Sequence, residues 1–146
     1  MSLAFRNLTT SPSDPVGTWP TEAVQAALER GDLEDWQRLA TEIDRRPWGQ
    51  TARQVEEVLG HSRPYGVAEL MESVIERARD RAERDEREAV AAEIRQAVAR
   101  SGLTRAEFAS RLGTSASRLS TYATGKVTPS ATLMLRIRRL LADLGG

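Results

Sequence analysis

A long stretch without glycine or proline, from Val67 to Arg100, constrains the fold more than any other feature of the sequence. Helix-forming residues, chiefly Ala, Glu, Arg, Leu, Met and Gln, make up most of it. A continuous helix over this stretch would be roughly 50 Å long. With 146 residues in all, the chain has room for one compact domain or two small ones. The stretch therefore predicts a long helix that links two small bodies.

The apolar residues of this stretch form two separate stripes. The first stripe consists of Leu70, Met71, Val74, Ile75 and Ala78. The second consists of Val90, Ile94, Ala97 and Val98. Residues 76–88 between them are polar on nearly every side, which is typical of a solvent-exposed bridge held by Glu–Arg pairs one turn apart. The apolar heptad breaks at Arg81 and Asp85, which argues against a coiled coil. Two helices with a kink near Asp85 are the alternative.

The chain divides into three segments around this bridge. Residues 1–17 predict an extended arm, because prolines and turn residues fill its second half, and Phe5 and Leu8 are its candidates for docking on the body. Residues 18–84 predict an N-terminal helical domain for dimerisation or partner binding, and residues 85–146 predict a second helical domain. No segment reads as a convincing strand, so the predicted fold class is all-α.

Three helices are expected in the N-terminal domain, at 21–30, 33–46 and 51–59. Gly31 is expected to end the first helix in a left-handed conformation, and Asp32 is expected to cap the second. The apolar face of the second helix consists of Leu33, Trp36, Leu39, Ala40 and Ile43. The tryptophans of this half are expected to be core anchors, with a protein interface as the alternative: Trp19, Trp36 and Trp48.

Composition excludes several classes of protein. With no cysteine there is no disulfide framework, thiolate nucleophile or cysteine zinc site, and a single histidine, His61, excludes histidine-rich metal sites. The carboxylates are scattered over polar helix faces, so we expect no catalytic residue, no metal, no cofactor and no enzymatic activity. No run approaches the ~20 apolar residues that span a bilayer, and the N-terminus lacks the features of a signal peptide. A cytoplasmic protein without a membrane partner is expected.

The last third of the chain begins with a compact set of caps and turns. Gly102 is expected to close the long helix, and Thr104 with Glu107 has the pattern of a capping box for a helix over 105–112. Gly113 permits a sharp turn directly after that helix, because it has no side chain to clash.

A second short helix follows this turn. Ser115 caps a helix over 115–122, in which Leu119 and Tyr122 are expected to point inward and the outer face is polar. Two short helices joined by a tight turn, the second with a polar outer face, form a helix-turn-helix unit. The predicted architecture is therefore an N-terminal helical subdomain, a long polar helix and a C-terminal helix-turn-helix bundle.

This segment resembles the Cro/phage-repressor (Xre-like) helix-turn-helix family. The residues that carry the resemblance are Gly102-Leu103-Thr104, Glu107-Phe108-Ala109, Arg111-Leu112-Gly113, Ser115, Leu119-Ser120, Tyr122, Gly125-Lys126 and Pro129-Ser130. The resemblance covers about residues 88–146 and does not extend to the N-terminal half. It implies a bundle of four or five helices whose third helix enters the major groove of DNA.

The resemblance also implies two groups of DNA-contacting residues. Those on the base-facing side of the recognition helix 115–122 are Ala116, Ser117, Thr121 and, at the groove wall, Arg118. Those that would reach phosphates are Arg105, Ser115, Gly125 and Lys126. Cationic side chains and the amides at helix N-termini are groups that bind phosphates. Ala116 offers only a methyl group to thymine, and the short hydroxyl side chains read bases ambiguously, so specificity is expected from Arg118, DNA shape or water.

The last helix departs from the family at one position. Pro129 and Ser130 begin it, and its apolar residues recur at helical steps, at Met134, Ile137, Leu141 and Leu144. Arg138 stands where the family often has a small apolar residue. This helix is therefore expected to pack differently from that of its relatives.

The formal net charge of zero hides an uneven distribution of charge. Residues 88–146 hold nine basic and four acidic residues, a net charge of +5, and residues 1–87 hold twelve and seventeen, a net charge of −5. A basic C-terminal third suits a DNA-facing surface, and an acidic remainder suits protein contacts. A helical bundle without a DNA partner is the weaker alternative.

The function predicted from these features is that of a sequence-specific transcriptional regulator, most simply a repressor, which binds double-stranded DNA as a homodimer. The alternative is an antitoxin that binds a toxin through its N-terminal half and autoregulates its operon through the helix-turn-helix. An enzyme such as a nuclease or nucleotidyltransferase is a third alternative, for which the sequence offers neither a metal-binding carboxylate cluster nor a glycine-rich phosphate loop.

Overall fold

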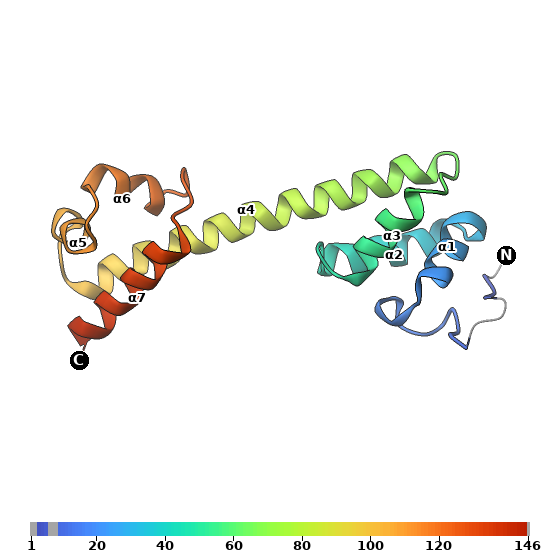
Figure 1. Ribbon diagram of the computed structural model, residues 1–146, viewed down its shortest axis with the longest axis horizontal. Helices are drawn as coiled ribbons and strands as arrows, with labels where there is room; N and C mark the ends of the chain where they lie inside the picture. Colours follow the sequence, from blue (N-terminus) through green and yellow to red (C-terminus); the bar gives the residue numbers. More distant parts are fainter. Residues whose placement is uncertain (1–2, 6–8, 146) are drawn as a thin grey trace. The chain divides into compact units, whose positions relative to one another are not determined.

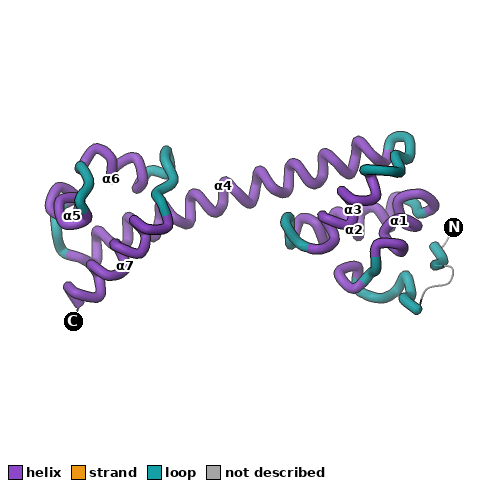
Figure 2. Tube along the Cα trace, in the orientation of Figure 1, coloured by secondary structure: helices purple, strands orange, loops and turns teal. Residues whose placement is uncertain are grey.

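The computed structural model describes residues 3–5 and 9–145, which form helices and loops and contain no strand (Figures 1 and 2). The all-helical fold is thereby confirmed. The elements are a 3-10 turn η1 (Val16–Thr18), α1 (Thr21–Arg30), α2 (Leu33–Arg45), α3 (Gln50–Leu59), α4 (Val67–Ser101), α5 (Arg105–Leu112), α6 (Ala116–Ala123) and α7 (Ala131–Gly145). Two compact units, 1–82 and 83–146, divide the chain at a point inside α4. Each unit has its own apolar core.

α4 is assigned as one helix from Val67 to Ser101, rather than as two separate helices. Its side chains from 83 to 89 are all exposed, as expected for a polar segment. The expected ion pairs one turn apart are absent from the described residues of 76–88. Instead Arg79 forms two hydrogen bonds with Glu56 of α3, at 2.8 and 3.0 Å, and Arg81 forms an ion pair with Asp44 of α2. These arginines therefore secure α4 to its neighbours within the N-terminal unit.

The N-terminal unit buries one face each of α1, α2, α3 and the first part of α4. Its largest fully buried side chains are Trp19, Leu28, Leu39, Ile43, Met71, Val24, Val55 and Val58. Two apolar residues expected to face the core, Leu33 and Leu70, are exposed instead. The buried stripe of α4 includes Ala68 and Met71. Leu70 lies about 100° from Met71 around the helix, so it points away from the core.

The three tryptophans have different environments. Trp19 is completely buried, and its indole N–H donates to the carbonyl of Asp14 at 3.1 Å. Trp36 is half-buried, and its indole N–H donates to the carbonyl of Ala27 at 2.9 Å. Trp48, at the α2–α3 corner, is 46% exposed. The core interpretation therefore holds for Trp19 and Trp36, and Trp48 lies at the surface.

The N-terminal segment is held against α2 through Arg38. The guanidinium of Arg38 donates to the carbonyls of Pro12 and Asp14, at 2.6 and 3.1 Å, and lies 5.0 Å from the centre of the Trp19 ring. Phe5 meets the same ring edge-on at 5.1 Å, which confirms that this residue docks on the body. Leu8, the other residue expected to dock, lies outside the described residues. The segment is also not extended to its end, because η1 begins at Val16, which is buried.

Gly31 ends α1, but the expected left-handed conformation is wrong. Its φ is −79° and its ψ is −178°, which is extended backbone open to any residue. The need for glycine is steric, because a Cβ atom at this position would lie 2.3 Å from the carbonyl oxygen of Ala27 and 2.8 Å from a carboxylate oxygen of Asp35. That carboxylate completes a reciprocal capping box with Asp32 at the start of α2.

The C-terminal unit packs α5, α6 and α7 with the last part of α4 (Figure 1). Its buried core consists of Ile94, Ala97, Phe108, Ala109, Leu112, Leu119, Ala123, Leu133, Met134 and Ile137. On α7, Leu133 is buried and Leu144 is exposed, so the predicted stripe needs correction at both ends. Arg138 points outward and forms an ion pair with Glu93 of α4 at 3.2 Å. Arg138 therefore does not interrupt the buried face of α7, which is apolar.

Candidate nucleic-acid interface

The first helix of the candidate interface, α5, is capped by Thr104. The Thr104 hydroxyl oxygen accepts a hydrogen bond from the backbone N–H of Glu107 at 3.1 Å. The expected capping box is only half formed, because the Glu107 carboxylate accepts from this same hydroxyl at 3.2 Å instead of from the backbone N–H of Thr104. The helix buries Phe108 and Ala109 and presents Arg105 to solvent at its first turn. α5 is thus capped at its start and packed against the core through three residues, of which Leu112 is the third.

The turn between α5 and α6 is a Schellman motif built on Gly113. Gly113 has a φ of +79°, in the left-handed region that favours glycine. The N–H of Thr114 donates to the Ala109 carbonyl at 3.0 Å, and the N–H of Gly113 donates to the Ser110 carbonyl at 3.1 Å. These bonds satisfy carbonyls at the end of α5 and turn the chain sharply into α6.

The second helix, α6, has a buried side and an exposed side. Ser115 caps it by accepting from the N–H of Arg118 at 3.0 Å. Leu119 and Ala123 are its buried residues, whereas Tyr122, which is expected to point inward, is half-buried at the edge of the core. No acidic residue lies in the first turn of α6, so nothing on this helix neutralises the partial positive charge of its N-terminus.

The four residues expected to face bases come to lie on α6 with unequal exposure. Ala116, Ser117 and Arg118 are exposed at its N-terminal end. Thr121 is half-buried, and its hydroxyl donates to the Arg118 carbonyl of the same helix at 2.6 Å. Because that hydroxyl hydrogen is used within the helix, Thr121 has only its oxygen lone pairs and its methyl group to offer to a ligand.

The four residues expected to bind phosphates lie at three places around α6. Ser115 is exposed at the N-terminus of α6, and Arg105 is exposed at that of α5. Gly125, with a φ of +79°, and the exposed Lys126 form the turn that follows α6. A hydroxyl therefore lies at the start of α6 and a cation just after its end, while Arg105 lies at the start of α5.

Sequence spacing gives no indication of two features of this unit. Arg95 of α4 donates to the carbonyl of Ala123, the last residue of α6, at 2.7 Å, and also forms an ion pair with Glu88 at 2.8 Å. The Thr114 hydroxyl in the turn is buried and makes no hydrogen bond within the described residues. The first is a contact across 28 positions of the chain, and the second depends on how the turn is covered, so no local pattern predicts either.

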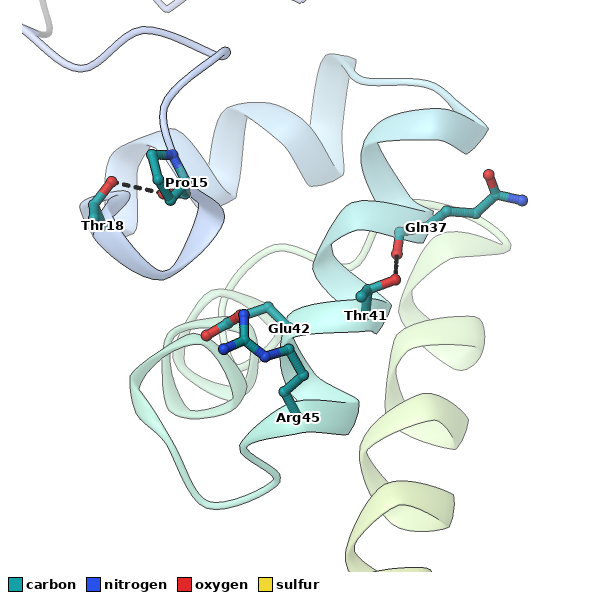
Figure 3. A network of polar contacts seen from close by, with 6 residues as sticks. All are labelled: Pro15, Thr18, Gln37, Thr41, Glu42 and Arg45. Atoms are coloured by element: carbon teal, nitrogen blue, oxygen red, sulfur yellow. Dashed lines mark hydrogen bonds and ion pairs between the residues drawn. The ribbon is translucent and has the colours of Figure 1, made fainter.

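An open groove of about 580 Å³ lies between η1 and α2 in the N-terminal unit. Figure 3 shows polar contacts among residues of its walls, which are Pro15, Thr18, Gln37, Thr41, Glu42 and Arg45. Thr18 donates to the Pro15 carbonyl at 2.6 Å, and Thr41 donates to the Gln37 carbonyl at 2.9 Å. Arg45 and Glu42 form an ion pair at 3.5 Å. These groups bond within their own turn or helix, so they serve local structure first.

The part of the chain that the structure describes holds neither a metal-binding cluster nor a membrane-spanning helix. No group of three or more carboxylate, imidazole or thiol side chains within 3–5 and 9–145 is placed to hold a metal ion. Over the same ranges, no helix is both long enough and apolar enough to cross a membrane.

The comparison with protein families identifies the C-terminal unit. A family model described as a helix-turn-helix domain matches residues 89–142. The match covers α5, the turn at Gly113, α6 and most of α7. Searches of curated proteins and of solved structures found no significant match to the chain. The C-terminal part is therefore a helix-turn-helix domain, and such a domain indicates a DNA-binding regulator.

Proposed function

We propose that the chain is a sequence-specific regulator of transcription, of the Cro/phage-repressor (Xre-like) kind, that represses by placing α6 in the major groove of double-stranded DNA. The observation that carries this proposal is the arrangement of α6, which is anchored by Leu119 and Ala123 and exposes Ala116, Ser117 and Arg118 beside an uncompensated helix N-terminus. The net charge of +5 over residues 88–146 supports the same ligand.

In this proposal the exposed residues divide into two roles. Arg118 reads a base edge or the groove wall, while Ala116 and Ser117 contribute close contacts that small side chains allow, and Thr121 accepts or makes apolar contact. Arg105, Ser115, Gly125 and Lys126 hold phosphates and set the register of α6 without reading sequence. Specificity then rests on few side chains, and DNA shape supplies the remainder.

The decisive experiment is selection of bound sites from random duplex DNA, followed by affinity measurements on the selected site. Arg118→Ala should weaken binding by roughly 1–3 kcal/mol and relax the preference at one base position. Lys126→Ala should weaken all sequences alike and flatten the salt dependence by about one unit. Arg136→Ala is the matched control, because this arginine is exposed on α7 and is not one of the proposed contacts. If neither Arg118→Ala nor Lys126→Ala exceeds the effect of the control, the groove arrangement is wrong.

We further propose that two copies act together as a homodimer through the acidic N-terminal half, because regulators of this kind bind half-sites about one helical turn apart. Light scattering at micromolar concentration, with and without the selected DNA, tests this directly. A mass of one chain under both conditions would refute the dimer, and a selected site without two-fold symmetry would refute its two-fold arrangement.

An antitoxin role is the second candidate, and surface aromatic residues of the N-terminal unit favour it. Trp48 is 46% exposed at a Pro-Trp-Gly corner, and Tyr65 is fully exposed before α4. Tryptophan and tyrosine are enriched at protein hot spots. A growth-arresting product of a small neighbouring gene should bind the chain, and Trp48→Ala should weaken that complex without weakening DNA binding. A solitary gene without such a neighbour would remove this candidate.

A further inference from the structure

A side chain of α4, outside the two helices of the helix-turn-helix motif, bonds the C-terminal end of α6. Arg95 donates from one guanidinium nitrogen to the Ala123 carbonyl at 2.7 Å and from the other to a Glu88 carboxylate oxygen at 2.8 Å. The Ala123 carbonyl belongs to the last turn of α6, where carbonyls have no partner within the helix. A cation at this end also interacts favourably with the helix dipole.

The same face of α4 receives the turn that follows α6. Glu88, Ala91 and Arg95 are spaced three and four residues apart, so they lie on one side of α4. Ala91 is completely buried, and a Cβ atom at Gly125 would lie 3.6 Å from the Ala91 Cβ, which is ordinary contact distance. This face of α4 therefore contacts the turn through the apolar Ala91 and bonds the end of α6 through the charged Arg95.

The length of α6 makes this end important for its direction. The helix has eight residues and is therefore about 12 Å long. A displacement of about 1 Å at its C-terminal end, with the N-terminal end held by Ser115 and the Gly113 turn, tilts the axis by about 5°. Side chains reach about 5–6 Å from the helix axis, so this tilt shifts their tips by about 0.5 Å, including those near the N-terminal end. Sites that depend on a few side chains tolerate displacements of only about that size.

We propose that Arg95 is a positioning residue for DNA recognition, which fixes the tilt of α6 through the Ala123 carbonyl and is itself oriented by Glu88. This role rests on the proposed function, because it concerns how α6 presents Arg118 and its neighbours to base edges. Arg95 is 42% exposed, so a direct contact to a phosphate beside Lys126 is the competing role, and the two roles have different consequences.

The experiment compares Arg95→Gln with Arg136→Gln on two duplexes of equal length, the selected site and a scrambled sequence. Each variant removes one exposed arginine from the C-terminal unit, but Arg136 has no ion pair within the described residues. Arg95→Gln should lose about tenfold in affinity for the selected site, as expected for a hydrogen bond to a charged group. Its affinity for the scrambled duplex and its salt slope should match those of Arg136→Gln.

Other outcomes would overturn the positioning role. A similar loss on both duplexes, with a salt slope flatter by about one unit than that of Arg136→Gln, would show a direct phosphate contact. No extra loss on the selected site would show that Arg95 serves only stability. Glu88→Gln should lose affinity for the selected site in the same direction and to a smaller extent, and an equal gain on both duplexes would show that Glu88 acts through its charge alone.

Amide hydrogen exchange without DNA separates this inference from the proposed function. In Arg95→Gln the amides of Thr124 and Gly125, which donate to the Ser120 and Tyr122 carbonyls at 3.1 and 3.2 Å, should exchange faster. The amide of Phe108 in α5 should be unchanged. If exchange responds but no DNA sequence is selected by the wild-type chain, the proposed function fails and the link to α4 stands. If exchange does not respond, the link fails whatever the DNA result.

Discussion

Substitution of Gly113 by alanine isolates the contribution of backbone conformation to the helix-turn-helix turn. The φ of +79° costs an L-residue roughly 1–2 kcal/mol. No atom lies within 4 Å of the position that a Cβ would take, so no clash adds to this cost. Alanine also lowers the conformational entropy of the unfolded chain, which stabilises the folded state by about 0.4–1 kcal/mol. We therefore expect Gly113→Ala to lower the free energy of unfolding of the C-terminal unit by about 1 kcal/mol, and Gly113→Asn to cost less, because asparagine tolerates this conformation.

The distribution of tryptophans provides the assay. All three lie in the N-terminal unit, so tryptophan fluorescence follows that unit while far-UV circular dichroism follows both. Gly113→Ala should lower the dichroism transition of the C-terminal unit by about 4–8 °C and leave the fluorescence transition in place. Gly145→Ala is the control, because Gly145 ends α7 with nothing near its Cβ position and without a positive φ. A loss above about 3 kcal/mol would refute the reasoning, because backbone strain alone cannot supply it, and so would an unchanged transition.

Three further results are expected. Gly31→Ala should destabilise the N-terminal unit by roughly 2–4 kcal/mol, because its Cβ would meet the Ala27 carbonyl at 2.3 Å, and an unshifted fluorescence transition would contradict this. Thr114→Val removes a buried hydroxyl without a hydrogen bond within the described residues and should stabilise the C-terminal unit by about 1 kcal/mol, whereas a loss of that size would reveal a partner for the hydroxyl. Hydrogen bonds from Arg79 hold the pKa of Glu56 below its ordinary value, so this stabilisation is full above the ordinary carboxyl pKa of about 4.3 and is lost as the pH falls through the lowered pKa. The difference in urea stability between wild type and Arg79→Gln should therefore be smaller at pH 3 than at pH 7, and an equal difference at both would contradict the assignment.

Helix boundaries in this chain follow from local chemistry, which explains why the sequence predicts them well. α1 is expected at 21–30 and lies at Thr21–Arg30, and α5 is expected at 105–112 and lies at Arg105–Leu112. Caps, glycines and prolines act within four or five residues of themselves, so their effects can be read without knowledge of the tertiary structure. The turn at Gly113 belongs to the same class, because its bonds connect residues no more than five positions apart.

The sequence-based predictions that failed concern which side of a helix packs against the neighbouring helices and which partners its charged residues bond. Leu70 and Met71 are adjacent apolar residues, and only the packing of α1, α2 and α3 decides which of the two is buried. The arginines show the same limit, because Arg79 and Arg81 suit pairs within α4 but bond to α3 and α2. A long arginine side chain reaches several acceptors from one position, so its partner is determined by the fold.

Some features of the candidate interface can be predicted from the local sequence, and others only from the fold. Its caps and its exposed α6 residues follow from local pattern, and their placement on the surface agrees with that pattern at Ala116, Ser117 and Arg118. The anchoring of α6 from α4 depends on a contact between Arg95 and Ala123, and no periodicity of either helix predicts it. The residues proposed to touch DNA are therefore accessible to sequence reasoning, whereas a residue proposed to aim them is accessible only from the structure.

The length of α6 also bears on the proposed homodimer. A helix of eight residues is about 12 Å long, and base pairs are stacked about 3.4 Å apart, so α6 can lie along at most about four base pairs. Four base pairs recur by chance roughly once in every 250, and a genome offers about 10⁶ or more competing sites. A second copy at a half-site one helical turn away lowers the chance frequency to roughly one in 60,000. Indirect readout adds to this but depends on a bound surface of similar size. The shortness of α6 therefore favours the proposed homodimer, and a single chain that held one site with nanomolar affinity at physiological salt would refute it.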